Sequence, residues 1–158
     1  MPRRKGISPV IATVIIVAVT IAVAIAVAFW MTGIIGLFTG AVEKLEIVSA
    51  TATAQVGGGW QITIVARNTG TTQTSVDVIF VNGYNAAQLI CNGQQVGVNP
   101  APPQVIRPGD QLQFVITINA GACQVDNNPV FTASPGVSIE VKLHTTGGKE
   151  YPKLLTLP

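Results

Sequence analysis

Few residues of this 158-residue chain could carry out chemistry. His144 is the only histidine, and it stands at the end of an expected strand, beside Thr145-Thr146-Gly147-Gly148. Zinc sites need several His or Cys ligands at short spacings, so one isolated histidine predicts no metal centre. The sequence holds no serine-centred elbow, phosphate-binding loop or calcium loop. We therefore expect no enzyme, no catalytic residue, no metal and no cofactor.

The acidic residues give no active site either, because they are scattered along the chain rather than paired. Beyond residue 70 they are Asp77, Asp110, Asp126, Glu140 and Glu150. Asp110 follows Pro108-Gly109, which is an ordinary position for a turn aspartate.

Cys91 and Cys123 are the remaining reactive groups. In an exported domain an even number of cysteines favours a disulfide. A bridge that closes a loop of about 33 residues would stabilise the fold by about 3–4 kcal/mol in the chain-entropy description. The alternative, two small buried thiols, stays open at this point.

The element that must position everything else is an uncharged stretch near the N-terminus. Residues 7–42 contain no charged side chain, follow Arg3-Arg4-Lys5-Gly6 and end before Glu43. A run of about 18 apolar residues is enough to predict a membrane-spanning helix. A helix of this length would reach roughly 54 Å, against a hydrocarbon core of about 30 Å. Spanning a bilayer accounts for about two thirds of that length.

The charge distribution gives this segment an orientation. Three of the nine Lys and Arg residues lie in the leader, which leaves six against seven Asp and Glu in the rest of the chain. The basic leader predicts a cytoplasmic N-terminus and an exported C-terminal part. No basic cluster occurs outside the leader, so nucleic-acid binding is not expected.

Two ordinary interpretations of the apolar stretch are available. A secretory signal peptide would use Ala24-Ile25-Ala26 or Ala26-Val27-Ala28 as its cleavage site, but its apolar core would be too long. Cleavage there would also leave Phe29-Trp30-Met31 at the new terminus. The second interpretation is an uncleaved membrane anchor.

The residues at the start of the stretch favour a third interpretation. Lys5-Gly6-Ile7-Ser8-Pro9-Val10-Ile11-Ala12-Thr13 resembles the class III signal peptide of archaeal type IV pilin precursors. The resemblance implies cleavage between Gly6 and Ile7, with Lys5 as the preceding basic residue and Ser8 as the small residue that follows. Ile11 stands where bacterial pilins usually carry a glutamate, which points to the archaeal branch. The start is also more similar to adhesion pilins than to archaellins.

This resemblance, which covers residues 3 to about 40, implies that the helix leaves the membrane and packs against identical subunits in a helical filament. A prepilin peptidase and a pilus assembly platform with its ATPase would be further partners. Small residues four apart permit close helix packing. The predicted packing residues are Ala18, Ala22, Ala26, Gly36 and Gly40. The alternative is that Ala and Gly are simply common in apolar helices.

From Glu43 onward short alternating segments are separated by turn residues such as Gly57-Gly58-Gly59 and Asn82-Gly83. Strands are predicted at residues 45–56, 60–67, 75–81, 88–91, 111–119, 137–144 and 150–157. Seven short strands favour an antiparallel immunoglobulin-like β-sandwich. The segments 62–70 and 106–116 also resemble phrases of exported immunoglobulin-like adhesion modules. Residues 94–103, with three prolines, are expected to form the largest irregular loop.

The sequence thus predicts an α+β chain of three parts: a cleaved basic leader (1–6), an apolar transmembrane and filament-core helix (7–42) and an extracytoplasmic β-sandwich (43–158). In the last part Thr, Asn and Gln number 30 against 13 charged residues, which suits a surface packed against copies of itself. The expected function is a structural subunit of an archaeal adhesion pilus, inserted in the membrane first and extracellular afterwards. The alternatives are a solitary membrane-anchored immunoglobulin-like binding module and, last, an extracytoplasmic enzyme.

Overall fold

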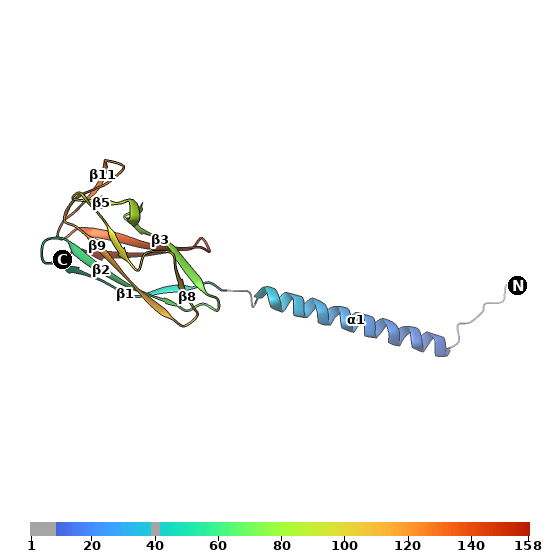
Figure 1. The fold of residues 1–158 in the computed structure, drawn as a ribbon. Helices are drawn as coiled ribbons and strands as arrows, with labels where there is room; N and C mark the ends of the chain where they lie inside the picture. The colour runs from blue at the N-terminus through green and yellow to red at the C-terminus, as the bar shows by residue number, and fades with distance from the viewer. Residues whose placement is uncertain (1–8, 39–41) are drawn as a thin grey trace. The chain divides into compact units, whose positions relative to one another are not determined.

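The structure is a computed structural model that describes residues 9–38 and 42–158. The chain divides into two units, Met1–Gly40 and Ala41–Pro158, and each is described by itself. The first contains one helix, and the second is built from strands (Figure 1).

Helix α1 runs from Pro9 to Phe38 and is 30 residues long, which corresponds to about 45 Å. Large apolar side chains are exposed on all its sides, with exposed fractions from 48% at Val27 to 75% at Phe29. Its polar side chains bond within the helix, since the hydroxyl of Thr20 donates to the Val17 carbonyl at 2.8 Å. In the described part of the chain α1 alone is long and apolar enough to cross a membrane, judged by length and composition (Pro9–Gly33, mean hydropathy 3.1).

Several residues singled out in the sequence belong to this unit. Ala18, Ala22 and Ala26 lie in α1, where a spacing of four places them along one side of the helix. Gly36 also lies in α1. The predicted cleavage residues Lys5, Gly6, Ile7 and Ser8, together with Gly40, lie outside the described residues.

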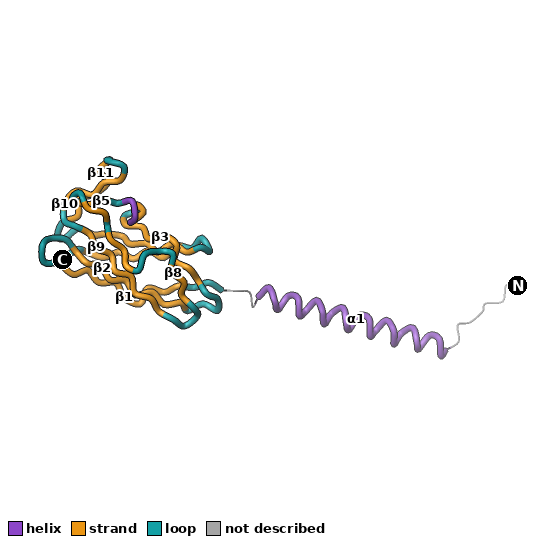
Figure 2. Tube along the Cα trace, viewed as in Figure 1, coloured by secondary structure: helices purple, strands orange, loops and turns teal. Residues whose placement is uncertain are grey.

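Thirteen strands make up the described part of the β domain (Figure 2). The long strands are β1 (Leu45–Ala54), β2 (Trp60–Asn68), β3 (Thr74–Val81), β9 (Gln111–Ile118), β10 (Gly121–Val125), β11 (Asn128–Ala133), β12 (Ser138–Thr145) and β13 (Glu150–Thr156). The short ones are β4 (Tyr84–Asn85), β5 (Ile90–Cys91), β6 (Gln94–Gln95), β7 (Gly97–Asn99) and β8 (Gln104–Ile106). A single turn of 3-10 helix, η1 (Ala86–Gln88), follows β4.

The strands form three antiparallel sheets. One has the order β1-β2-β9-β7, and a second has the order β13-β12-β3-β4 with β8 also paired to β3. The third is the small sheet β11-β10-β5-β6. Edge strands β1 and β13 lie close together, and both large sheets contribute buried residues to one core.

The hydrophobic core lies between the two large sheets. Strand β2 alternates regularly, with Trp60, Ile62 and Ile64 buried and their neighbours partly exposed. Fully buried partners come from β9, β3 and β12. They are Phe114, Ile116, Val76, Ile79, Val141 and Leu143. Each such side chain contributes about 1.5–3 kcal/mol by leaving water. The predicted α+β class with an antiparallel sandwich is confirmed.

The number of strands was underestimated by the sequence pattern. The hairpin of β10 and β11 was missed because its strands carry polar residues and include Pro129. Residues 94–103 were expected to form one irregular loop, and this was wrong in part: β6 and β7 lie there, and Val98 pairs with Ile116 of β9. β6 pairs locally with β5, whereas β7 owes its conformation to β9, a partner far away in the sequence that local propensity does not encode.

Candidate functional site: an uncharged helix and the start of the β domain

The first candidate site is the surface of α1. Between Pro9 and Phe38 the helix carries no charged side chain, and neither its first turn nor its last turn holds a compensating charge. A shallow hollow of about 380 Å³ on this helix is lined by Thr13, Val14, Val17, Ala18 and Ile21. The small side chain of Ala18, one of the predicted packing residues, lies in this hollow. Such a surface can pack against lipid or against another apolar helix without desolvating a charge.

The second candidate site is the start of the β domain, residues 42–44, which we call the lead-in segment. The backbone N–H groups of Thr69 and Gly70 both donate to the Lys44 carbonyl, at 2.9 and 3.1 Å. The N–H of Thr71 donates to the Val42 carbonyl at 2.9 Å, and the Val42 N–H donates to the Thr71 hydroxyl at 3.1 Å. The β2–β3 loop therefore holds the lead-in segment by its backbone.

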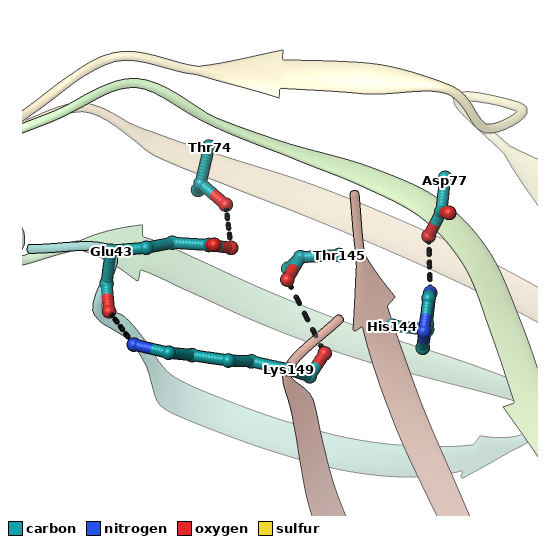
Figure 3. A network of polar contacts seen from close by, with 6 residues as sticks. All are labelled: Glu43, Thr74, Asp77, His144, Thr145 and Lys149. Carbon is teal, nitrogen blue, oxygen red and sulfur yellow. Dashed lines mark hydrogen bonds and ion pairs between the residues drawn. The ribbon is translucent and has the colours of Figure 1, made fainter. Parts of the chain in front are cut away.

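Glu43 connects the lead-in segment to β3 through its side chain and to the β12–β13 turn through its backbone carbonyl (Figure 3). The Thr74 hydroxyl of β3 donates to Glu43 Oε1. From the β12–β13 turn, Lys149 Nζ donates to the Glu43 backbone carbonyl at 2.5 Å. Glu43 therefore lies between β3 and the β12–β13 turn and is hydrogen-bonded to both.

Two glycines make room for the lead-in segment. A Cβ at Gly70 would lie 2.7 Å from Lys44 N and would collide with the Val42 carbonyl oxygen. A Cβ at Gly147 would collide with the carboxylate of Glu43, in a backbone conformation that any residue could adopt. The need for glycine at these positions comes from close approach and not from the turn itself.

The electrostatics of Glu43 favour its charged form. Burial alone would raise the pKa of Glu43, but the hydroxyls of Thr145 and Thr74 and the positive charge of Lys149 outweigh it. The pKa of Glu43 is therefore held below its ordinary value of 4.5. The Thr145 hydroxyl also lies 3.3 Å from the Lys149 carbonyl, so Thr74 is the firmer of the two donors.

His144 takes part in a structural row of side chains on the sheet β13-β12-β3. Its Nδ1 lies 2.7 Å from Asp77 Oδ1, and its ring meets Phe80 edge-on, with 6.3 Å between ring centroids. Lys142 lies over Phe80 and pairs with Glu150 at 2.9 Å. Across residues 9–38 and 42–158 no group of three His, Cys, Asp or Glu residues could hold a metal ion. We assign this row to the stabilisation of the sheet.

Cys91 and Cys123 lie directly opposite each other on the paired strands β5 and β10. A disulfide joins them in the structure, and both residues are fully buried. The bridge fastens the small sheet, because β5 and β10 are its two central strands.

The sequence pattern did not reveal the lead-in segment as a site. Glu43 was noted only as the end of the uncharged stretch, and Gly147 only as a turn residue. The available signal was the placement of Thr-Gly pairs at residues 69–70 and 146–147, which could mark loops approached by another backbone.

Comparisons with known proteins were made on both sequence and structure. No protein-family model and no curated protein sequence matches the chain. A solved structure of the archaeal flagellum of Methanospirillum hungatei strain JF1 is similar, with a TM-score of 0.50, 17% identity, and coverage of 94% of this chain and 88% of that chain. The periplasmic stator protein FlaG of the Sulfolobus acidocaldarius archaellum matches with a TM-score of 0.42 and 17% identity, over 72% of this chain and 100% of that chain.

A third solved structure, the Iho670 flagellar-like filament, matches with a TM-score of 0.34 and 13% identity, over 95% of this chain and 98% of that chain. At these identities only the first similarity carries weight, and it concerns the fold. The chain shares its arrangement, an N-terminal helix followed by a β domain, with a subunit of an archaeal surface filament.

Proposed function

We propose that this chain is the precursor of a filament-forming structural protein, a subunit of an archaeal type IV pilus. Its N-terminal helix would first hold the protein in the membrane, with the N-terminus in the cytoplasm and the β domain outside. After cleavage by a prepilin peptidase, an assembly platform would move the helix into the core of an extracellular filament of identical subunits.

The observation that carries this proposal is the uncharged surface of α1. Its large apolar side chains are exposed from Val10 to Met31, and no charge occurs over the 30 residues of the helix. Such a helix needs an apolar environment at every side, which lipid or neighbouring helices supply. The fold shared with the Methanospirillum hungatei filament supports the second of these environments, in which α1 packs against neighbouring helices.

We propose a pilus for surface or cell adhesion rather than an archaellum. The support is the start Ile7-Ser8-Pro9-Val10-Ile11, which resembles adhesion pilins. A β domain rich in Thr, Asn and Gln also suits repeated contact with neutral surfaces. Because the row around His144 is engaged in structural contacts, a structural role is favoured over an enzymatic one.

A Gly6→Phe variant tests the proposal, because the bulky side chain should block cleavage before Ile7. We expect this variant to stay in the membrane with Met1 or Pro2 at its N-terminus, while the natural protein is recovered in filaments that begin at Ile7. Mass spectrometry of the N-terminal peptide and electron microscopy of shed material give the two readouts. A Lys44→Ala variant, changed beyond the helix, is the matched control and should assemble.

The second candidate is a solitary membrane-anchored binding module. It predicts that the natural protein keeps its leader and that no filaments are shed. Finding filaments made by the Gly6→Phe variant would contradict both the cleavage site and the two-environment role of the helix.

A further inference from the structure

We propose that a hollow at the far end of the β domain binds neutral saccharides through side-chain amides. We call it the amide hollow. It has a volume of about 270 Å³ and is lined by Gly57, Gly58, Asn92, Gln94, Asn119 and Ala120. It lies where β1 ends, whereas the lead-in segment lies where β1 begins. The inference deepens the adhesion part of the proposed function and rests on that function only for its biological role.

Three turns are fixed against one another to form the amide hollow. The β1–β2 turn lies close to the end of β9, because a Cβ at Gly59 would lie 2.5 Å from the Ile118 carbonyl oxygen. The Asn92 N–H donates to the Ala122 carbonyl at 3.0 Å, which fastens the β5–β6 turn to β10. The disulfide of Cys91 holds the same two strands together. The walls are therefore set by the backbone before any ligand arrives.

The amides themselves are partly oriented and partly free. Asn119 Nδ2 donates to Gln94 Oε1 at 2.6 Å, which fixes the planes of both side chains. Within the described part of the chain, Asn119 Oδ1, Gln94 Nε2 and the side chain of Asn92 make no hydrogen bond to protein. An amide carries both a donor and an acceptor, so together they present the alternating donors and acceptors that neighbouring sugar hydroxyls require.

The chemistry of the lining excludes other ligand classes. No lining residue is charged, so an anionic or cationic ligand would lose its hydration without gaining a counter-charge. The lining has no large apolar side chain either, which disfavours a greasy ligand. At Gly57 and Gly58 the hollow is lined by backbone without side chains, and a Cβ at either position would meet nothing within 4 Å. At this volume one sugar ring fits better than an extended chain.

A site without an aromatic platform should bind one sugar weakly, with a dissociation constant in the millimolar range. Repetition of the site along a filament would convert this weak affinity into firm attachment, because linked sites raise the effective concentration of each next contact. A weak site on each subunit is therefore sufficient for firm attachment of a filament that repeats it.

The test uses the full chain in detergent micelles, so it does not depend on filament assembly. The probes are the methyl glycosides of glucose, mannose, galactose and N-acetylglucosamine. Their binding is measured in NMR titrations that monitor the side-chain amide signals of the protein. We expect at least one glycoside to shift the signals of Asn92, Gln94 and Asn119 at millimolar concentration. Gln94→Glu keeps the shape but removes a donor and should weaken binding at least fivefold.

The triple variant Asn92→Ala, Gln94→Ala, Asn119→Ala should abolish the shifts. The control Asn127→Ala, Asn128→Ala, changed in the β10–β11 turn and at the start of β11, lies outside the lining and should bind normally. Loss of binding in both variants, no shift with any of the four glycosides, or tighter binding of methyl glucuronide would overturn the inference. Filaments that still form from the triple variant would show that the pilus function stands apart from this site.

Discussion

At the scale of single residues, Glu43 is where a charge first appears after α1, and the β domain has arranged several groups around it. A hydroxyl of β3 donates to its carboxylate, a lysine of the β12–β13 turn donates to its backbone carbonyl, and the missing side chain of Gly147 leaves room for the carboxylate. Such convergence holds the start of the β domain in place against local fraying. Two predictions follow from this arrangement.

Replacing Glu43 by Gln should lower the free energy of unfolding by about 1 kcal/mol at pH 7, because a hydrogen bond to a charged acceptor becomes one to a neutral acceptor. The pKa of Glu43 is lowered in the folded protein. Its charge therefore stabilises the fold above pH 4.5, and this contribution is lost as pH falls through the folded pKa. Thermal unfolding followed by near-ultraviolet circular dichroism measures the difference at several pH values.

The matched control is Glu46→Gln, since Glu46 is exposed on β1 and the structure gives its side chain no hydrogen bond within the described residues. The unfolding free energy of this control should differ little from that of the natural protein at every pH measured. If the destabilisation by Glu43→Gln did not diminish as the pH falls through the folded pKa of Glu43, the charge would not be what matters.

Gly147→Ala should act through Glu43 and not through the turn. The added Cβ would push the carboxylate away from Thr74 and should cost about 1 kcal/mol. In a Glu43→Ala background the collision partner is gone, so the same substitution should cost almost nothing. A double-mutant cycle on unfolding free energies measures this coupling.

Gly148→Ala is the comparison for that cycle. Gly148 has a φ of +77° and open space around its Cβ position, so alanine there is strained in every background. Its cost should be the same with and without Glu43. If Gly147→Ala were additive with Glu43→Ala in the same way, the proposed contact would be wrong.

At the scale of secondary-structure elements, the sequence pattern located what is locally encoded. The apolar stretch predicts α1, and strict alternation in β2 and β9 predicts their strands and their buried faces. The pattern did not find β7, whose three residues are ordered by pairing with β9. Nor did it find the three groups around Glu43, because they come from residues 74, 147 and 149, which only the fold brings together.

The small sheet depends on one covalent link, and its removal should have a local consequence. Replacing Cys91 and Cys123 by Ser should lower the unfolding free energy by about 3–4 kcal/mol in the chain-entropy description. Hydrogen exchange should accelerate first in β10 and β11 and last in β2, because β2 lies in the large buried core. Peptide mapping without reduction checks the bridge itself, and two free thiols in the natural protein would contradict it.

At the scale of the whole molecule, the chain separates two kinds of surface. α1 carries no charged side chain between residues 9 and 38 and is mostly apolar, whereas the β domain carries many neutral polar groups, with 13 charges among residues 43–158. A filament built from such subunits would be held by helix packing and by hydrogen bonds between uncharged groups.

This leads to the last prediction, which concerns the response of assembled filaments to salt and to detergent. Salt screens charge interactions, with a Debye length of about 10 Å at 0.1 M and 3 Å at 1 M. Filaments held by uncharged surfaces should therefore keep their length between 0.05 and 1 M NaCl, roughly the span over which surface ion pairs fail. Detergent above its critical micelle concentration should dissociate them, because it offers α1 another apolar environment. Sedimentation with electron microscopy of the pellet measures both responses. Dissociation by salt alone would place the main subunit contacts on charged side chains, against the assignment of α1 as the filament core.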